Sequence, residues 1–472
     1  MEQRINAAAK ARLKAIVGDK RFLDDQQSLV SYSYDATPMY QAMPEAVVFP
    51  VSTEEVSAIM KVAFAEEIPV YTRGSASNLA AGTVPVHGGL ALVMTRMNRL
   101  IELDLDNLTA TVEAGLVTKT LHDAVREQGL FYPPDPGSMT VSTIGGNIAQ
   151  CAGGLHGLKY GTTKDYVLGL TAVLPNGEII RTGGKLTKDV AGYDLTKLLV
   201  GSEGTLAVIT EAILKLLPAP PYKRVLLALF DDMRAAGRTV SRVIAARIIP
   251  GTLEFMDQGT IRVVEDFARI GLPTEVKALL VIGQDGQQAI VDEDIRRISE
   301  ICREEAIEVQ VAQTDDDIDN IMKARRIALS ALARMKPTTI LEDATVPRSK
   351  IAPMVERIME ISEKHNVRIC TFGHAGDGNL HPTCMTDARD HQEIERVEAA
   401  FEEIFEAALG LGGTITGEHG VGMAKAPYLE WKVGAAGIEV MKGIKLAFDP
   451  KGILNPGKMF AGETRKRVVL HQ

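Results

Sequence analysis

The sequence predicts an α+β protein that is divided into two parts near its middle. In the first half, helical and strand patterns alternate irregularly between glycine-rich turns, which is typical of mixed sheets. In the second half, strands and helices alternate with short connections, which indicates an antiparallel or mixed sheet covered by helices on one face. The prolines of Pro218-Ala219-Pro220-Pro221 end the first pattern and stiffen a linker, so they predict the boundary.

The first half begins its regular pattern with the capping box Ser52-Thr53-Glu54-Glu55, which predicts a helix running toward Glu67. Strands are expected at residues 70–72, 90–94, 100–105 and 109–113, followed by a helix at 118–128. The turn signal Pro175-Asn176-Gly177 predicts a hairpin between strands at 167–174 and 178–182. Between these elements, residues 133–161 are rich in glycine and show no periodicity, so we expect an irregular segment that binds a ligand.

The second half is expected to form one sheet domain. The expected strands are residues 225–230, 252–256, 278–282 and 308–311, and the helices between them are residues 233–246, 259–270 and 288–306.

Composition excludes several classes of protein. The chain has 472 residues, of which 46% are hydrophobic, which is enough for two or three globular domains. Its formal net charge of -9 provides no electrostatic footprint for nucleic acid. The four cysteines form no Cys-x-x-Cys pair, so neither an iron–sulfur cluster nor a disulfide framework is encoded, and a reducing, cytoplasmic location is expected. The sequence shows no segment that would span a membrane, although peripheral membrane contact is compatible with it.

Four glycine-rich passages in the first half could hold a phosphate-bearing cofactor. The passage from Gly74 to Gly82 follows a strand, and its small residues would let backbone N–H groups wrap a pyrophosphate; a plain surface loop is the alternative. Neither the Gly-x-Gly-x-x-Gly fingerprint nor a phosphate-binding P-loop occurs, which argues against a Rossmann unit and a nucleoside-triphosphate site. The other three passages are residues 134–149, 153–161 and 201–209.

Two glycine-rich turns in the second half contain residues that commonly bind metals. His374 and His381 lie in the turn at 373–381, and Glu418 and His419 lie in the turn at 417–420. Two imidazoles and one carboxylate on turns with little side-chain bulk can form a divalent-metal site that faces a substrate. Solvated histidines on ordinary turns are the alternative that the two motifs leave open.

Taken together, these motifs resemble the flavoproteins of the vanillyl-alcohol-oxidase type, and among them the FAD-linked D-2-hydroxyacid dehydrogenases. That family includes D-lactate dehydrogenases, D-2-hydroxyglutarate dehydrogenases and glycolate oxidase catalytic subunits. The resemblance extends from about Pro44 to Phe460. It implies an FAD-binding domain of two α+β subdomains at residues 1–218, an antiparallel-sheet cap domain at 219–415, and a C-terminal helical segment at 416–472 that completes the active site and returns to the FAD domain.

The resemblance also implies which residues bind the cofactor. The first loop would hold the FAD pyrophosphate, and the later passages would line the flavin and adenosine portions. Because the first loop contains no histidine, we expect FAD to be bound non-covalently. The implied residues are Arg73, Gly74, Ser75, Ala76, Ser77, Asn78, Gly82, Pro134, Asp135, Gly137, Ser138, Thr143, Gly145, Gly146, Asn147, Ala149, Gly153, Gly154, Tyr160, Gly161, Val208, Ile209 and Asn455.

For the chemical site, the resemblance implies that His374, His381 and Glu418 bind a divalent metal and that His419 is the active-site base. The substrate carboxylate requires a cation, preferably a guanidinium, and Arg325 is the best match. Relatives usually have a Trp-x-x-Arg pattern here, but this chain has Met322 in place of tryptophan and a second arginine, Arg326, so either arginine could take the role.

The expected function is the FAD-dependent oxidation of a small D-2-hydroxy acid, D-lactate or glycolate, to the 2-oxo acid. Hydride would pass to flavin N5, and the metal, which could be Zn, Fe, Mn or Co, would polarise the substrate. An electron-transfer flavoprotein, an iron–sulfur subunit or a quinone would then accept the electrons. A flavin-binding but non-catalytic subunit of a larger oxidase complex is the alternative.

Overall fold

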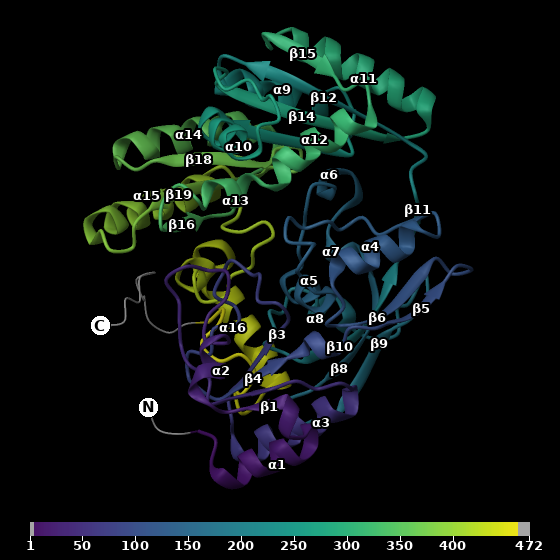
Figure 1. Ribbon diagram of the computed structural model, residues 1–472, viewed down its shortest axis with the longest axis vertical. Helices are drawn as coiled ribbons and strands as arrows, with labels where there is room; N and C mark the ends of the chain where they lie inside the picture. The colour runs from purple at the N-terminus through teal and green to yellow at the C-terminus, as the bar shows by residue number, and fades with distance from the viewer. Residues whose placement is uncertain (1–3, 461–472) are drawn as a thin grey trace. The chain divides into compact units, whose positions relative to one another are not determined.

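The computed structural model describes residues 4–460 and divides into two compact units. Within the described residues, unit 1 comprises residues 4–152, 162–219 and 418–460, and unit 2 comprises residues 153–161 and 220–417. The colours of Figure 1 show this interleaving, because unit 1 contains purple, blue and yellow segments, whereas most of unit 2 is teal and green.

Unit 1 contains a four-stranded sheet in the order β1-β2-β4-β3. Its strands are β1 (Phe22–Leu23), β2 (Ala46–Val48), β4 (Leu90–Val93) and β3 (Val70–Arg73). β2 and β3 both pair in parallel with β4. Helices α1 (Ala7–Val17) and α3 (Thr53–Glu66) supply side chains to a core that includes Leu13, Ile59 and Val70. The side chain of Ser52 caps α3 by accepting from Glu55 N, as the capping box predicts.

The second sheet of unit 1 has five antiparallel strands in the order β5-β6-β10-β8-β9. They are β5 (Leu100–Asp104), β6 (Thr109–Glu113), β10 (Val208–Lys215), β8 (Val167–Val173) and β9 (Ile179–Gly183). The predicted hairpin between β8 and β9 is present, and Gly177 takes the positive φ of 84° that its turn requires. Unit 1 also contains α2 (Gln26–Val30), α4 (Thr118–Arg126), β7 (Leu130–Phe131), α7 (Thr163–Tyr166), α8 (Leu195–Leu199) and β11 (Leu217–Pro218).

The glycine-rich passage after β7 is more regular than its sequence predicts. It forms α5 (Ile144–Gln150), whose first turn is capped by Thr143, and the short helix α6 (Gly157–Tyr160). Glycine normally disfavours a helix, but a Cβ at Gly145 would lie 2.7 Å from the Cβ of Ala114. The close packing of α5 therefore requires the glycine that made the passage look irregular.

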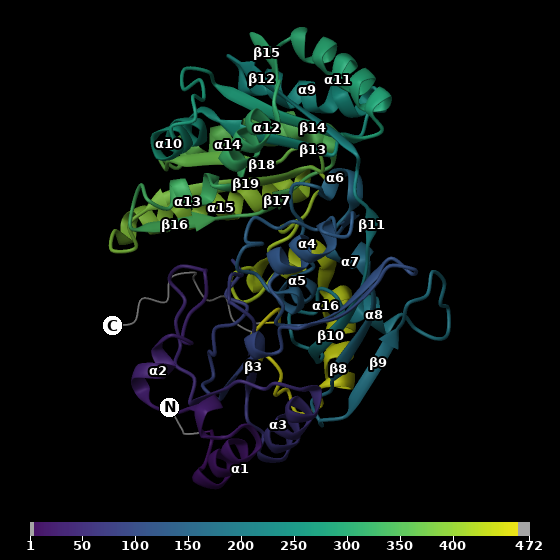
Figure 2. The same cartoon turned by 45° about the vertical axis from the view of Figure 1, so that its right-hand side comes forward.

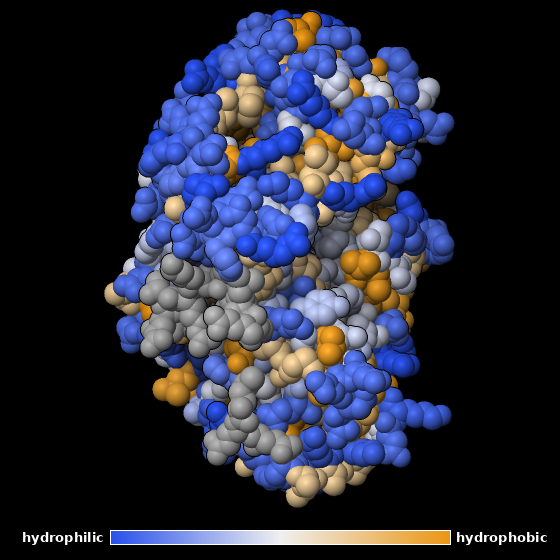
Figure 3. All heavy atoms as spheres, turned by 60° about the vertical axis from the view of Figure 1, so that its left-hand side comes forward, coloured by the Kyte–Doolittle hydropathy of each residue, from blue (hydrophilic) through white to orange (hydrophobic). Residues whose placement is uncertain are grey.

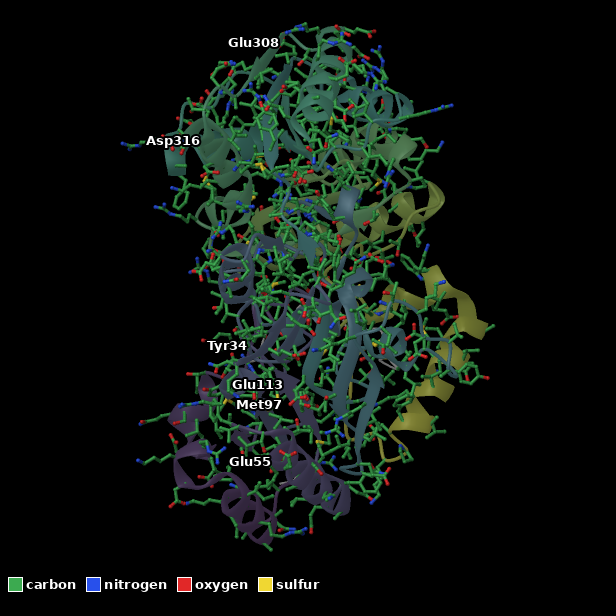
Figure 4. The ribbon with its side chains drawn as sticks, turned by 90° about the vertical axis from the view of Figure 1, so that its right-hand side faces the viewer. Tyr34, Glu55, Met97, Glu113, Glu308 and Asp316 are labelled. Atoms are coloured by element: carbon green, nitrogen blue, oxygen red, sulfur yellow. The ribbon has the colours of Figure 1, made fainter. Side chains whose placement is uncertain are left out.

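Unit 2 is built on an eight-stranded sheet, in which β15-β12-β14-β13-β18-β19-β16 form a continuous path and β17 also pairs with β19. Every pairing is antiparallel, which confirms the predicted antiparallel sheet. Figure 4 labels Glu308 on β15, the outer strand of this sheet. The strands are β12 (Tyr222–Phe230), β13 (Thr252–Asp257), β14 (Ala278–Gly286), β15 (Glu308–Val311), β16 (Thr338–Leu341), β17 (Ala344–Thr345), β18 (Ile369–His374) and β19 (Asn379–Thr386).

Helices pack against this sheet and against one another. α11, α9, α14 and α15 contact each other in that order, and α10 contacts α13 (Figure 2). The helices of unit 2 are α9 (Met233–Ala245), α10 (Gln258–Ala268), α11 (Gln288–Arg303), α12 (Asp315–Arg326), α13 (Ala328–Leu332), α14 (Ile351–Lys364) and α15 (His391–Gly410).

The C-terminal segment of unit 1 confirms the predicted helical return. Helix α16 (Leu429–Phe448) bends at Gly434, and the chain then runs beside β3. Val70 N donates to Ile453 O at 2.8 Å, and Asn455 N donates to Val70 O at 2.8 Å. The end of the described chain is thereby hydrogen-bonded to the strand that precedes the first glycine-rich loop.

Among the helices formed by residues 4–460, none combines the length and the apolar character needed to cross a membrane. In the face shown in Figure 3, hydrophilic residues predominate and hydrophobic residues form small, separate patches.

Candidate functional site

The two histidines predicted to bind metal lie together in unit 2. His374 ends β18, and His381 is the third residue of β19, so the tight turn between the strands brings them onto one hairpin. Their ring centroids are 5.2 Å apart with the rings perpendicular, and a ring nitrogen of each lies within 4.8 Å of one of the other. Both side chains are buried, which does not fit the alternative of solvated histidines.

A buried carboxylate that the sequence did not point to supports His374. Glu254 lies on β13 and is 1% exposed. Its two oxygens lie 2.8 and 2.9 Å from Nδ1 of His374. When Nδ1–H donates to this carboxylate, Nε2 of His374 keeps its lone pair and can bind a metal.

The same carboxylate faces Arg325, whose Nε lies 2.6 Å from Oε2 of Glu254. Arg325 is 5% exposed, and its guanidinium stacks 4.8 Å from the centroid of Phe372. Among the described residues, Nη2 of Arg325 has no hydrogen-bond partner. A buried guanidinium with a free donor suits a carboxylate ligand. Arg326, the other candidate, is exposed, so the burial favours Arg325.

A second buried carboxylate, Asp343, contacts the histidine hairpin at Asn379 and His381. It accepts hydrogen bonds from Thr416 Oγ1 at 2.6 Å and from Gly417 N at 2.7 Å, and it also accepts from the side-chain amide of Asn379. One of its oxygens lies 3.8 Å from Nδ1 of His381. Asp343 therefore connects the histidine hairpin to Gly417, the residue that precedes Glu418.

Glu418 and His419 begin the last segment of unit 1. The peptide bond to Gly417 places the Cα of Glu418 about 3.8 Å from that of Gly417, which Asp343 holds. Within unit 1, the carboxylate of Glu203 accepts from Val421 N at 2.7 Å and from Gly422 N at 2.6 Å, just beyond His419. Burial raises the pKa of Glu203, while these two backbone bonds oppose the shift.

The first glycine-rich loop of unit 1 is held by side chains that the sequence did not single out. Asp35 accepts from Thr83 N at 3.1 Å, and Oγ1 of Thr37 accepts from Ala81 N at 2.7 Å. From within the loop, Asn78 accepts from Gly82 N at 2.8 Å. These bonds hold the loop backbone in place.

Arg73 and Asn455 also hold this region. Arg73 is buried and donates through Nη1 to the carbonyls of Tyr32 and Tyr34, so that nitrogen already has protein partners. Asn455 donates to Gly82 O at 2.9 Å and to Glu203 O at 2.7 Å. Its side chain thereby joins the C-terminal segment to two of the glycine-rich passages.

The first loop also meets helix α5. A Cβ on Gly74 would lie 2.1 Å from Oγ1 of Thr143, and a Cβ on Gly82 would lie 3.1 Å from Nε2 of Gln150. Only a residue without a side chain allows this approach at Gly74. The first glycine-rich loop and the start and end of α5, two of the passages predicted to bind FAD, therefore lie side by side.

The other predicted cofactor residues are divided between the units. Val208 and Ile209 are buried at the start of β10 in unit 1. Gly153, Gly154, Tyr160 and Gly161 belong to unit 2, although the chain on both sides of them belongs to unit 1.

Comparison with known families defines the class of this protein. Residues 44–183 match an FAD binding domain, and residues 219–459 match the C-terminal domain of FAD linked oxidases. The chain therefore belongs to the FAD-linked oxidase family and is an FAD-linked oxidoreductase.

The names of individual relatives point to a narrower class of reaction. The chain is 59% identical over 466 residues to glycolate oxidase subunit GlcD of Bacillus subtilis (strain 168), which covers 98% of this chain and 99% of the relative. It is 40% identical to a D-lactate dehydrogenase of Archaeoglobus fulgidus, over 91% of this chain and 95% of that protein. These relatives support FAD-linked hydroxyacid oxidation.

The fold is shared with more distant flavoproteins. A crystal structure of p-cresol methylhydroxylase with substrate bound aligns with a TM-score of 0.81 at 17% identity, covering 97% of each chain. Together with the family matches, this likeness confirms the predicted vanillyl-alcohol-oxidase-type fold.

Proposed function

We propose that this protein oxidises a small D-2-hydroxy acid, D-lactate or glycolate, to the corresponding 2-oxo acid, with non-covalently bound FAD as the hydride acceptor. The observation that carries the proposal is the buried array in which Glu254 contacts both Arg325 and His374, beside His381. The array contains a cation that can bind the carboxylate of a 2-hydroxy acid. It also contains imidazoles that can bind a metal, which would polarise the hydroxyl group of that acid. The names of the relatives support the same substrate class.

Each residue would have a separate task. Arg325 would bind the substrate carboxylate through its free Nη2 and thereby fix which face of C2 is presented. His419 would take the proton of the substrate hydroxyl at an imidazole nitrogen, a step in which a general base contributes about 10²–10⁴-fold in rate. FAD, when bound, supplies the hydride acceptor.

His374, His381 and Glu418 would hold a divalent metal. Two neutral imidazoles and one carboxylate suit Zn, Fe, Mn or Co, and the Glu254 contact favours the tautomer of His374 that can bind one of them. A bound metal would polarise the substrate hydroxyl and so make its proton easier for His419 to remove. Asp343 would support this set by holding His381 and the chain before Glu418.

For the cofactor, the loop at 73–82 would hold the FAD pyrophosphate. Its backbone is already fixed by Asp35, Thr37 and Asn78, which lowers the entropic cost of binding. The rest of the cofactor would be lined by residues 134–149, Val208, Ile209 and Asn455, together with Gly153, Gly154, Tyr160 and Gly161.

An external carrier would be needed to accept the electrons that FAD, when bound, takes from the substrate. The sequence contains no Cys-x-x-Cys pair that would hold an iron–sulfur cluster of its own, and a 59% identical relative is named as a subunit of glycolate oxidase. An electron-transfer flavoprotein, an iron–sulfur subunit or a quinone would fit this requirement. We propose that these reactions take place in the cytoplasm.

Anaerobic bleaching of the flavin absorbance near 450 nm tests the proposal. D-lactate or glycolate is expected to bleach the purified protein, the L-enantiomer of lactate is not, and prior removal of metal with a chelator should abolish bleaching while FAD stays bound. His419→Ala should retain FAD but bleach at least about 100-fold more slowly. If no 2-hydroxy acid bleaches a flavin-loaded protein, the alternative of a flavin-binding, non-catalytic subunit replaces this proposal. Normal bleaching by His419→Ala would remove His419 from the mechanism.

A further inference from the structure

A short segment of the region that matches the FAD binding domain belongs to unit 2 rather than to unit 1. The match to the FAD binding domain covers residues 44–183 without interruption, yet residues 153–161 group with unit 2. Their helix, α6, contacts β13, and Figures 1 and 2 both show it next to the sheet of unit 2. The chain enters the segment from Ala152 and leaves it at Thr162, both in unit 1.

One carboxylate at the end of β14 holds this segment. The Lys159 ammonium forms an ion pair with Asp285 Oδ1 and donates to Asp285 O at 2.5 Å. The Tyr160 hydroxyl donates to Asp285 Oδ2 at 2.9 Å. The Asp285 side chain is 12% exposed, so these charge-assisted bonds are largely protected from solvent.

The local packing leaves little freedom for this carboxylate. A Cβ on Gly251 would lie only 3.0 Å from Asp285 Oδ1. Gln284 accepts from both Gly251 N and Asp285 N and donates to Asp294. Asp285 therefore has a fixed position on the sheet, and its bonds to Lys159 and Tyr160 hold α6 against that sheet.

The segment also packs against the histidine hairpin. A Cβ on Gly157 would lie 2.8 Å from Asp377 Oδ2, and a Cβ on Gly376 would lie 2.4 Å from Cδ2 of Leu158. The hairpin turn is itself held to β13, because Gly376 N donates to Leu253 O at 2.9 Å. The residues proposed to line FAD at 153–161 and the turn that carries His374 thus form one packed assembly within unit 2.

We propose that Asp285 is a positioning residue for FAD. Through Lys159 and Tyr160 it fixes the segment 153–161, so that the FAD-lining residues of this segment keep a constant position relative to the histidine hairpin. The inference rests on the proposed role of Gly153, Gly154, Tyr160 and Gly161 in FAD binding. Asp285 acts through these residues rather than by touching the cofactor.

Reconstitution of the full chain with FAD tests the proposal. Asp285→Asn removes the charge, and we expect the Kd for FAD to rise about tenfold. The visible circular dichroism of the bound flavin should change, which a loss of fold stability alone would not cause in protein that remains folded. Asp294→Asn is the matched control, because Asp294 bonds Gln284 in the same network without contacting the segment, and it should leave both readouts unchanged. If Asp285→Asn does not fold, Lys159→Met, which removes the ion pair with Asp285 and leaves Tyr160 unchanged, should give a smaller change in the same direction.

An unchanged FAD Kd and flavin spectrum in Asp285→Asn, or in Lys159→Met if it must serve instead, would overturn the proposal. Gly153→Ala identifies which premise has failed. If Gly153→Ala alters FAD binding while Asp285→Asn does not, the segment binds FAD but Asp285 does not position it. If neither variant alters FAD binding, the proposed contact between the segment and FAD is itself wrong.

Discussion

At the scale of single residues, the site depends on carboxylates shared between functional groups. Glu254 is the clearest case, because its two oxygens contact both the arginine proposed to bind substrate and a histidine proposed to bind metal. A buried carboxylate of this kind is stable only with such partners, since an isolated buried charge carries a large desolvation penalty. Arg325 therefore balances the charge of Glu254, and the two contacts fix the orientation of His374 and Arg325.

Glu254→Gln keeps the size of the side chain but removes its charge. We expect metal affinity to fall about 10–100-fold, because the basicity and orientation of His374 both depend on this contact. Metal retained after dialysis against a graded chelator would measure the change, with FAD content determined in parallel and expected to be normal. Glu275→Gln, at a side chain 90% exposed, is the control. Wild-type metal retention in Glu254→Gln would show that the contact does not support metal binding.

At the scale of elements, the β18–β19 hairpin places the histidines because its turn is unusually close to its neighbours. Gly378 has a φ of 94°, and a Cβ there would lie 2.0 Å from Val346 O. A Cβ on Gly373 would lie 2.4 Å from Asn379 O. The glycines of this motif are therefore required by the backbone geometry that brings His374 and His381 together.

Gly378→Ala should destabilise the protein by at least about 1–3 kcal/mol, because alanine at this φ is strained and its methyl group would also displace Val346. Urea unfolding of the FAD-loaded protein would measure the loss. Gly443→Ala is a matched control in α16, where a Cβ meets nothing within 4 Å, and it should stabilise the helix by about 0.5–1 kcal/mol. An unaltered unfolding midpoint in Gly378→Ala would mean that the turn relaxes freely.

At the scale of the whole molecule, buried ionisable groups make stability depend on pH. Lys458 is 3% exposed, and its ammonium donates to Val84 O at 2.6 Å and lies 5.3 Å from the centroid of the Tyr71 ring. Burial lowers the pKa of Lys458 to about 7, although Asp35 and Glu203 oppose the shift. Because the pKa of an unfolded lysine is about 10.4, the unfolded chain binds the extra proton between these two values.

Because of Lys458, the free energy of unfolding should therefore rise as the pH increases from about 7 toward about 10. Below pH 7 the buried lysine is charged, and its burial should destabilise the fold most. Comparison of urea midpoints for the wild type and Lys458→Met from pH 6 to pH 9.5 would isolate this contribution. The wild type should gain stability relative to the variant as the pH rises. A difference between the two proteins that is constant across this range would contradict a lowered pKa.

Local patterns in the sequence predicted a large part of the fold. Capping, strand alternation and turn chemistry depend on residues close together in the chain, so β6 at Thr109–Glu113 was predicted at its observed bounds and the β8–β9 hairpin at its turn. The failure at α5 has a tertiary cause, because the contact with Ala114 requires a glycine that local propensity disfavours in a helix.

By itself, the sequence predicted the class of protein correctly and placed His374 and His381 in one short motif, since both depend on short segments whose residue types carry the chemistry. It also proposed which glycine-rich passages bind FAD, and that proposal stays a prediction. Only the tertiary structure decided that Glu254 and Asp343 support the histidines, that Arg325 rather than Arg326 is buried, and that residues 153–161 belong to unit 2. The reason is sequence separation: Glu254 and His374 are 120 residues apart, and their contact exists only because β13 and β18 pair in one sheet.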